Sequence, residues 1–578
     1  MSAKINRLPK NISRRQFLIY AGSGLAAGAL AACTPAAPTS APAPAEATAA
    51  PAAQPAGGAQ PAPAAAAGGQ TLVVAVPGGP GSMDMEFSAS DGSHQTIFNV
   101  CLAPLRFDPV PIGQAYQPDF SQLKPGAAKE WKVAPDAKSI TVTLREGVLS
   151  SVGNELTADD VIYSFERILT LKGISSGLLG LATGLTDPKQ VVKEGKYTYT
   201  INVDNPNVLL EAIQAHAACL IWDSVEYKKH STQDDPWSTK WAATNIVGHG
   251  AWKVTEFTPG QSWTMERNEN YYNPSDMTGN VTKISYRIIP SESSRVALIQ
   301  TGDVDMAFGL GAAALKTLES ANGVRVDNLP GNALQWLGFT FGDTAPELQD
   351  LNVRHAIQLA LPYEDLLARP YLGLAQQMYC TVAPIYPGWD TIKEIWTTKQ
   401  DLAKAKETLA QSEWPTGFNT TLHYDISVAG QEESAILIKS ALAQIGINVD
   451  LVKLQPSDYN NLAFGQQGFP ALFLYKDFVG TPDPNFGSQL YIVGGHCCAA
   501  GKYANKEIDA LYNQAVTTIG DLPKRIELQK QIEDIAWNKD PMGAPLQTLG
   551  FQMACRSNVT GWWWQSLQEV LWHKASKA

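Results

Sequence analysis

Signatures of catalysis and of nucleic-acid binding are missing from this chain of 578 residues. The chain contains no HExxH motif and no CxxC pair, and its eight histidines form no dense cluster. These absences exclude the common zinc hydrolases and dithiol oxidoreductases. Lysine and arginine number 44 against 55 acidic residues, and no basic run follows the N-terminus, which argues against a nucleic-acid partner. The composition therefore predicts a protein that is not an enzyme and needs no cofactor.

Cysteine is also scarce, with seven residues in the chain. The metal-like run His-Cys-Cys at residues 496–498 is a weak chelator, because neighbouring side chains on an extended chain point apart. Six cysteines remain after Cys33, an even number that is typical of proteins in an oxidising compartment. We therefore expect disulfides rather than a metal site, with buried thiols as the alternative. Six cysteines allow 15 sets of pairings, here among Cys101, Cys219, Cys380, Cys497, Cys498 and Cys555.

The N-terminus lacks a hydrophobic run long enough to span a membrane. Residues 13–18 read SRRQFL, which matches the twin-arginine export pattern, and the uncharged segment 17–32 is shorter than the roughly 20 residues of a spanning helix. Residues 30–33 read LAAC, a lipoprotein signal-peptidase box in which Cys33 would take the lipid. The alternative is an uncleaved anchor helix with a chance cysteine. Because two independent signals have the right spacing, we predict a lipoprotein signal peptide over residues 1–33.

Residues 34–69 are almost all Ala, Pro, Gly and Thr, and Glu46 carries the only charge. Such a segment buries too little apolar surface to offset the entropy of ordering, so we predict a disordered tether with a reach on the order of 30 Å. A domain on such a tether would lie outside the cell membrane and touch it through the lipid alone.

The remaining chain is too long for one ordinary domain and is rich in aromatic residues, with 15 Trp and 19 Tyr. Within residues 126–169, Ile140, Val142 and Leu144 alternate with polar residues, which predicts a strand with one buried face. Thr157 then caps a predicted amphipathic helix. Farther on, residues 422–426, 432–445 and 449–454 read as strand, helix and strand, which predicts a sheet covered by helices.

Residues 126–169 also resemble a characteristic block of the family 5 extracytoplasmic solute-binding proteins, the peptide, nickel and oligosaccharide receptors of ABC importers. Residues 247–254, 302–307 and 351–361 resemble further blocks of the same family. The departure in the first block is residues 150–154, where the family commonly has a His/Asp-Gly turn. The matching residues of that block are Trp131, Pro135, Asp136, Leu144, Arg145, Gly147, Val148, Thr157, Ala158, Asp160, Val161, Ser164 and Arg167.

This resemblance implies a two-lobed α/β fold like that of the large periplasmic peptide receptors (type II), with an extra subdomain in the first lobe. We expect lobe I to span residues 70–327 with the inserted subdomain, lobe II to span 328–543, and the segment 544–578 to return to lobe I. A monomer is expected.

Residues 472–486, LFLYKDFVGTPDPNF, resemble a cleft loop of the family whose first aspartate pairs with the α-amino group of a bound peptide. Asp477 matches that aspartate, and the aromatic residues around it would form the walls of the ligand site. The loop here is longer by residues 479–481, so Asp483 is an alternative ligand contact. Lys476 could instead neutralise Asp477. The expected aromatic walls are Tyr475, Phe478 and Phe486.

The resemblance implies a substrate receptor that captures a small solute between its lobes and delivers it to the permease subunits of an ABC transporter. We favour a peptide as the solute because the carboxylate loop is partly kept. An oligosaccharide or a metal chelate is the alternative within this class, since tryptophan is available to stack on sugars. The alternatives of another class are an exported enzyme and a sensor on the same scaffold.

Overall fold

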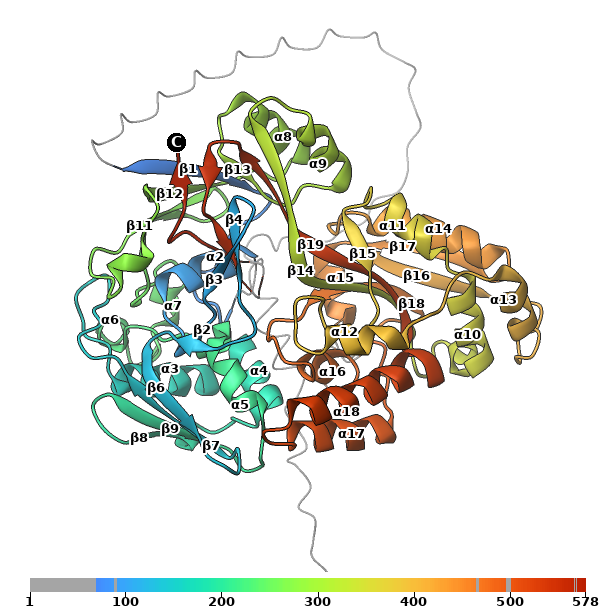
Figure 1. Cartoon of the computed structure of the whole chain (residues 1–578), viewed down its shortest axis with the longest axis horizontal. Coiled ribbons are helices and arrows are strands. Elements are labelled where there is room, and N and C mark those ends of the chain that lie inside the picture. Colours follow the sequence, from blue (N-terminus) through green and yellow to red (C-terminus); the bar gives the residue numbers. More distant parts are fainter. Residues whose placement is uncertain (1–68, 88–90, 464–466, 495–499, 566, 568) are drawn as a thin grey trace, which may run out of the picture.

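The computed structural model describes the following residues: 69–87, 91–463, 467–494, 500–565, 567 and 569–578. The predicted signal peptide with Cys33, most of the predicted tether, and the His-Cys-Cys run at 496–498 lie outside them. The described chain forms two lobes that lie side by side and are joined by two long strands (Figure 1). Among the described helices, none combines the length and the apolar character that crossing a bilayer requires.

One mixed sheet passes through both lobes in the order β10-β11-β12-β1-β13-β19-β14-β18-β16-β17, with β15 paired to β19. The strands of this sheet in lobe I are β1 (Gln70–Val76), β10 (Trp252–Thr258), β11 (Ser262–Arg267), β12 (Val281–Ile288) and β13 (Met306–Ala307). Those in lobe II are β15 (Ala375–Gln377), β16 (Asn419–Asp425), β17 (Asn448–Leu454) and β18 (Leu472–Phe478).

The strands β14 (Val324–Gly338) and β19 (Gly543–Arg556) run antiparallel and belong to both lobes. The first half of β14 pairs with the second half of β19 beside β13 of lobe I. The second half of β14 pairs with the first half of β19 beside β18 and β15 of lobe II. The pairing shifts register between Leu329 and Ala333. Gly331 lies in this break, where a Cβ would come within 2.4 Å of the Leu549 carbonyl oxygen. The two lobes are therefore joined at an irregular point of one strand pair, which we call the hinge pair.

Lobe I also contains a separate four-stranded sheet in the order β6-β7-β9-β8, with helix α3 packed beside it. The predicted strand is β7, and the alternation is confirmed because Ile140, Val142 and Leu144 are fully buried. Thr157 caps α3 and forms a capping box with Asp160, as the sequence predicts for this helix start. The elements of this part are β6 (Ala128–Val133), β7 (Ser139–Leu144), α3 (Ala158–Leu171), α4 (Ile174–Thr183), β8 (Val191–Lys193), β9 (Thr198–Asn202), α5 (Leu209–Ala212), α6 (Ser224–Lys229) and α7 (Thr239–Ala242).

The rest of lobe I consists of helices and short strands around the large sheet. The C-terminal strand β21 pairs with both β4 and β22, which brings the end of the chain back to lobe I. These elements are α2 (Asp91–Val100), β2 (Leu105–Arg106), β3 (Pro109–Ile112), β4 (Ala115–Pro118), β5 (Lys124–Pro125), α8 (Glu292–Thr301), α9 (Ala312–Glu319), β20 (Val559–Thr560), β21 (Trp563–Trp564), β22 (Val570–Leu571) and β23 (Ser576–Lys577).

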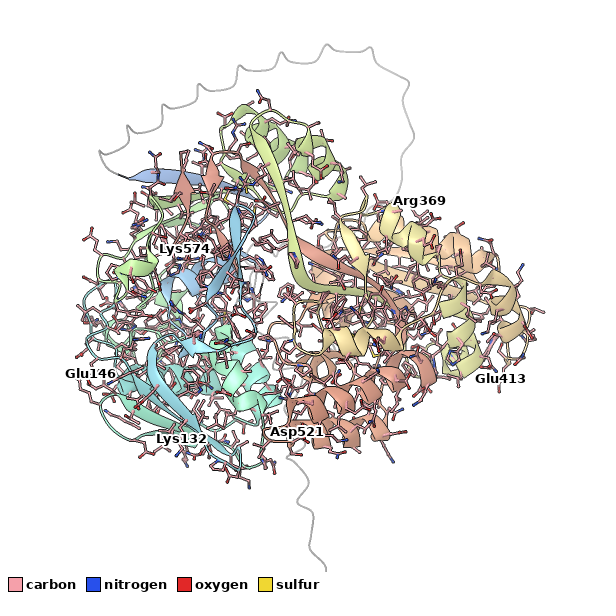
Figure 2. All side chains as sticks on the ribbon, in the orientation of Figure 1. Lys132, Glu146, Arg369, Glu413, Asp521 and Lys574 are labelled. Atoms are coloured by element: carbon pink, nitrogen blue, oxygen red, sulfur yellow. The ribbon has the colours of Figure 1, made fainter. Side chains whose placement is uncertain are left out.

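Lobe II is built on the predicted strand-helix-strand unit, which the structure confirms as β16, α14 and β17 with the two strands parallel. Asp521, which caps α18, lies where lobe II approaches lobe I (Figure 2). The helices of this lobe are α10 (Leu351–Ala360), α11 (Tyr363–Ala368), α12 (Trp389–Ile392), α13 (Leu402–Leu409), α14 (Gln431–Ala443), α15 (Pro456–Ala463), α16 (Phe486–Tyr491), α17 (Lys506–Val516) and α18 (Leu522–Asp534).

The expected disulfides are wrong for the four cysteines that the structure describes. Each is a free thiol in a separate, fully buried environment, and burial raises its pKa. The described residues also contain no group of three or more potential metal ligands. Cys497 and Cys498 lie outside the described residues. The buried thiols are Cys101, Cys219, Cys380 and Cys555.

Candidate functional site at the lobe junction

The lobes contact each other at a second place, away from the hinge pair. The backbone amide of Val208 in lobe I donates to the Val516 carbonyl in lobe II at 3.0 Å. The Gln489 side-chain amide on α16 donates to the Leu181 carbonyl on α4. Residues from both lobes are thus in direct contact, and we call this surface the lobe junction.

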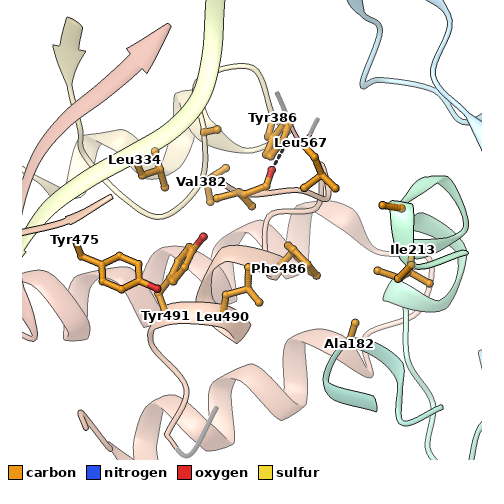
Figure 3. Close-up of a cluster of buried hydrophobic side chains, with 14 of the residues drawn as sticks. Ala182, Ile213, Leu334, Val382, Tyr386, Tyr475, Phe486, Leu490, Tyr491 and Leu567 are labelled. Carbon is orange, nitrogen blue, oxygen red and sulfur yellow. Dashed lines mark hydrogen bonds between the residues drawn. The ribbon is translucent and has the colours of Figure 1, made fainter. Parts of the chain in front are cut away.

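Apolar side chains fill the centre of the lobe junction (Figure 3). Phe486 and Leu490 of α16 face Ala182 and Ile213 of lobe I, and all four side chains are buried. The Phe486 ring also lies 6.5 Å, between centroids, from the imidazole of His216 in lobe I. The junction therefore resembles a protein core more than a wet surface, so that its closure removes water from whatever lies between the lobes.

The segment that follows β18 crosses the junction. Val479 is fixed to the hinge pair, because its carbonyl accepts a hydrogen bond from the Asn332 side chain at 2.9 Å and another from the Tyr386 hydroxyl. At the next position, a Cβ on Gly480 would lie 2.5 Å from Leu567 and 2.9 Å from His216, both in lobe I. Gly480 therefore permits a close approach of the lobes that a larger residue would prevent.

Asp477 lies at the end of β18, in lobe II, and is partly buried. One of its oxygens accepts the Phe478 backbone N–H at 2.8 Å, and among the described residues no Lys or Arg nitrogen lies within 4.0 Å of its carboxylate. Burial raises the pKa of Asp477 to about 6, while the Phe478 amide, the Lys476 charge and two tyrosine hydroxyls lower it. Lys476 is therefore a nearby charge but not a direct ion-pair partner. The two hydroxyls belong to Tyr475 and Tyr491.

Asp483 has a different environment from Asp477. Its carboxylate accepts two hydrogen bonds from the Arg525 guanidinium, at 2.5 and 2.6 Å, and a third from the Asn485 backbone amide at 2.9 Å. Both members of the ion pair are buried. Because its oxygens are occupied by protein donors, Asp483 serves the structure of the loop, and we assign no ligand contact to it.

The predicted aromatic walls do not form one surface. The Tyr475 ring packs in lobe II, 4.7 Å from Trp336 and on the same face of β18 as Asp477. Phe478 lies on the opposite face of the strand, with the Lys476 ammonium 5.8 Å from its ring centroid. Phe486 belongs to the lobe junction. The structure thus brings together Tyr475 and Asp477, and it separates Phe478, Asp483 and Phe486 from them.

Sequence reasoning missed several residues of the junction that come from distant parts of the chain. Desolvation lowers the pKa of His216 to about 3, with a smaller contribution from His94, so the imidazole is neutral near pH 7. Burial raises the pKa of Glu569 to about 8. Neither residue belongs to a motif, and only the folded chain brings them to the junction.

A separate cavity lies within lobe I and contains none of the predicted site residues. Its volume is about 320 Å³, and an ion pair between Arg106 and Asp276 at 2.7 Å spans part of its wall. The remaining lining residues are Asp108, Pro109, Pro111, Tyr116, Trp563, His573 and Lys574.

Comparison with known proteins gives the same two-lobed architecture. The chain is 22% identical, with a TM-score of 0.72, to the ABC transporter-associated periplasmic binding protein DppA from Helicobacter pylori in complex with the peptide STSA, over 87% of this chain and 98% of that one. A dipeptide binding protein from Pseudoalteromonas sp. SM9913 in complex with Met-Leu gives a TM-score of 0.72 at 20% identity, over 88% and 100% of the two chains. The predicted two-lobed α/β fold class is therefore confirmed.

Relatives of known sequence extend over most of the chain. It is 24% identical to heme-binding protein A of Haemophilus influenzae, over 80% of this chain and 88% of the relative. It is 23% identical to the dipeptide-binding protein DppE of Bacillus subtilis, over 80% and 84% of the two chains. The family model of the bacterial extracellular solute-binding proteins, family 5, matches residues 122–495. The chain belongs to the bacterial extracellular solute-binding proteins of family 5.

Proposed function

We propose that this protein is the substrate receptor of an ABC importer and that its cargo is a peptide. The observation that carries the choice of a peptide is Asp477, a partly buried carboxyl group with no basic partner within 4.0 Å among the described residues. Relatives of similar length whose names specify dipeptides support the same choice. The α-amino group of a peptide would supply the missing positive charge through short charge-assisted hydrogen bonds.

The hinge pair and the lobe junction supply the mechanism of capture. An open form exposes the surfaces of both lobes, and a ligand that contacts both of them shifts the equilibrium towards the closed form. Closure removes water from the apolar junction around Phe486 and so strengthens the polar contacts of the ligand. The solute leaves unchanged when the lobes reopen, and the protein acts as a receptor rather than as an enzyme.

The second candidate cargo is a metal chelate. It is favoured by one observation, the 24% identity to a protein named heme-binding protein A over 80% of this chain. A chelate such as heme would place no ammonium group beside Asp477. Binding of heme that is unaffected by Asp477→Asn would therefore favour this candidate over a peptide.

The proposed location is the outer face of the cell membrane, where a lipid on Cys33 would anchor a monomer after export by the twin-arginine route. The support for this location is the arrangement of SRRQFL at residues 13–18 and LAAC at residues 30–33. The test is membrane fractionation of the Cys33→Ala variant. Because loss of Cys33 also removes the peptidase box, fractionation is combined with metabolic labelling by a radioactive fatty acid. We expect the wild type to take up the label and the variant to take up none, and equal labelling of the two would refute the lipid anchor.

The test of the proposed cargo uses the purified protein and synthetic peptides. Native mass spectrometry first identifies what copurifies, and calorimetry then compares a tripeptide with its N-acetylated form. We expect acetylation and Asp477→Asn each to weaken binding by at least about tenfold, because either change removes one charge of the pair. Asp450→Asn, at an exposed aspartate on β17, is the matched control and should bind normally. Unchanged affinity of Asp477→Asn would show that this carboxylate does not hold the peptide.

A further inference from the structure

A hairpin in the C-terminal part of lobe I reaches the lobe junction. β21 and β22 pair antiparallel, with Trp563 opposite Leu571. The backbone amide of Gln565 donates to the backbone carbonyl of Glu569 at 2.9 Å across the turn. Within this turn, Leu567 lies against Gly480 of lobe II and beside Tyr386 (Figure 3). A segment from the very end of lobe I therefore forms part of the surface that lobe II closes on.

Glu569 is the acidic residue of this turn, and it is completely buried. Its Oε2 accepts the Leu567 backbone amide at 2.8 Å, whereas its Oε1 has no hydrogen-bond partner among the residues that the structure describes. No lysine or arginine nitrogen of the described chain lies within 4.0 Å of the carboxyl group. Glu569 is thus a buried acid in which one of the two carboxyl oxygens is free to accept a hydrogen bond.

Tyr386 of lobe II lies close to this acid, at a place where the two lobes meet. Its hydroxyl donates to the Val479 carbonyl, and its ring packs edge-on against Phe120 of lobe I at 5.0 Å between centroids. Burial is the main reason that the pKa of Tyr386 is raised, and the charge of Glu569 raises it further. The Glu569 carboxyl group also accepts the amide of Leu567, the residue that lies against Gly480 of lobe II, so we expect separation of the lobes to increase its exposure to water.

Closure of the lobes over Glu569 carries a free-energy penalty when no cation is buried with the carboxylate. Burial of an unpaired carboxylate is strongly unfavourable, and the protein can avoid it only by protonating the group or by burying a cation with it. A ligand that brings a positive charge to Oε1 removes this penalty in the closed form and not in the open one. Only such a difference between two forms shifts their equilibrium.

We propose that Glu569 receives a second cationic group of the cargo, separate from the α-amino group assigned to Asp477, so that the receptor selects peptides with a basic side chain. This inference depends on the proposed function, because it specifies which peptides the receptor prefers. Two carboxyl groups on opposite lobes, Asp477 in lobe II and Glu569 in lobe I, would then each hold one positive charge of the same ligand.

The experiment compares three tripeptides by calorimetry at pH 7.5: Ala-Lys-Ala, Ala-Arg-Ala and Ala-norleucine-Ala. Norleucine keeps most of the aliphatic chain of lysine and lacks the ammonium group. We expect the wild type to bind the two basic peptides at least about tenfold more tightly than the norleucine peptide. Equal binding of the three peptides by the wild type would overturn the inference, and this measurement needs no variant.

The variants identify the residue responsible. Glu569→Gln should bind all three peptides about equally, and Asp477→Asn should bind all of them more weakly while keeping the preference for the basic ones. Glu86→Gln is the matched control, because Glu86 is also buried in lobe I and one of its oxygens has no hydrogen-bond partner in the described part of the chain. Its Oε2 accepts the Ser175 backbone amide of α4 in the same lobe. It should keep the wild-type preference. A preference that persists in Glu569→Gln would overturn the inference and leave the proposed function intact, whereas absence of binding to any peptide would overturn both.

Discussion

The Val208 amide of lobe I lies 3.0 Å from the Val516 carbonyl oxygen of lobe II, and this bond closes the molecule at the side opposite the hinge pair (Figure 1). A backbone hydrogen bond of this kind contributes only about 1 kcal/mol net, since both groups bond to water when the lobes separate. The closed form therefore depends on a few bonds of this size and on the apolar contacts around Phe486. The difference in free energy between the open and closed forms is therefore small enough for a bound solute to shift.

Gly480 sets how closely the lobes approach. Gly480→Val places a Cβ where Leu567 and His216 lie at 2.5 and 2.9 Å, so we expect the closed form to become strained and the affinity for peptide to fall by at least about tenfold. Small-angle scattering should show a larger radius of gyration for the variant than for the wild type. Gly195→Val is the control, because a Cβ there meets nothing within 4 Å. Equal scattering profiles and affinities for Gly480→Val and the wild type would contradict the assignment.

The ion pair between Asp483 and Arg525 should matter for folding and not for ligand recognition. Arg525→Ala leaves a buried carboxylate without its partner, so we expect the free energy of unfolding of lobe II to fall by about 3–5 kcal/mol. Urea unfolding measures this change. Lys393→Ala removes the partner of the exposed Asp390 and should cost less than about 1 kcal/mol.

The same experiment separates the two roles considered for Asp483. Peptide affinity should be the same in the folded fraction of Arg525→Ala as in the wild type, because the pair lies outside the proposed ligand contacts. A selective loss of affinity without loss of stability would instead place Asp483 at the ligand.

Local elements of the fold follow directly from the sequence. The alternation at residues 139–144 predicts β7, Thr157 predicts the start of α3, and the spacing of apolar residues over 432–445 predicts α14. In each case the signal is contained in neighbouring residues, because the period of the apolar side chains and the capping side chain act over one or two turns. The prediction of disulfides was wrong for the four described cysteines because the number of cysteines gives no information on the distances between them in the fold.

The site could be predicted only in part. The loop resemblance predicts Asp477 as a ligand contact, but the loop sequence does not show that Asp483 pairs with Arg525, 42 residues away. Glu569 has no sequence signal at all: its position results from the return of the C-terminal segment to lobe I. Contacts of this kind depend on long-range packing, which periodicity and motifs do not encode.

The raised pKa of Asp477 predicts a pH dependence of binding. The carboxylate form is needed to hold an ammonium group, and a pKa of about 6 makes most of the group neutral at pH 5. We expect the affinity for the norleucine tripeptide, which has no basic side chain, to fall about tenfold between pH 7 and pH 5, while its α-amino group stays protonated. Asp477→Asn should show a flat profile over this range. A fall of the same size in the variant would assign the titration to another group.

The stability of the ligand-free protein should depend on pH in the opposite direction to its affinity for peptide. Because the folded pKa of Asp477 lies above its ordinary value of 3.8, the folded protein holds this proton more tightly than the unfolded one. The contribution of Asp477 to stability is therefore fully present below about pH 4 and is lost as the pH rises through 6. Subtraction of the Asp477→Asn unfolding curve from that of the wild type isolates this contribution.

Burial of the four thiols predicts how they react with a thiol reagent when no reductant is present. In a variant that begins at residue 34 and carries Cys497→Ser and Cys498→Ser, the thiols that remain are Cys101, Cys219, Cys380 and Cys555. We expect a thiol reagent to label essentially none of them in the folded protein, because burial both blocks access and raises their pKa, which suppresses the reactive thiolate. In guanidinium chloride all four should react. Loss of a pair of reactive thiols after unfolding would show that a disulfide forms between two of these cysteines, and a melting temperature that falls on reduction would confirm that it stabilises the fold.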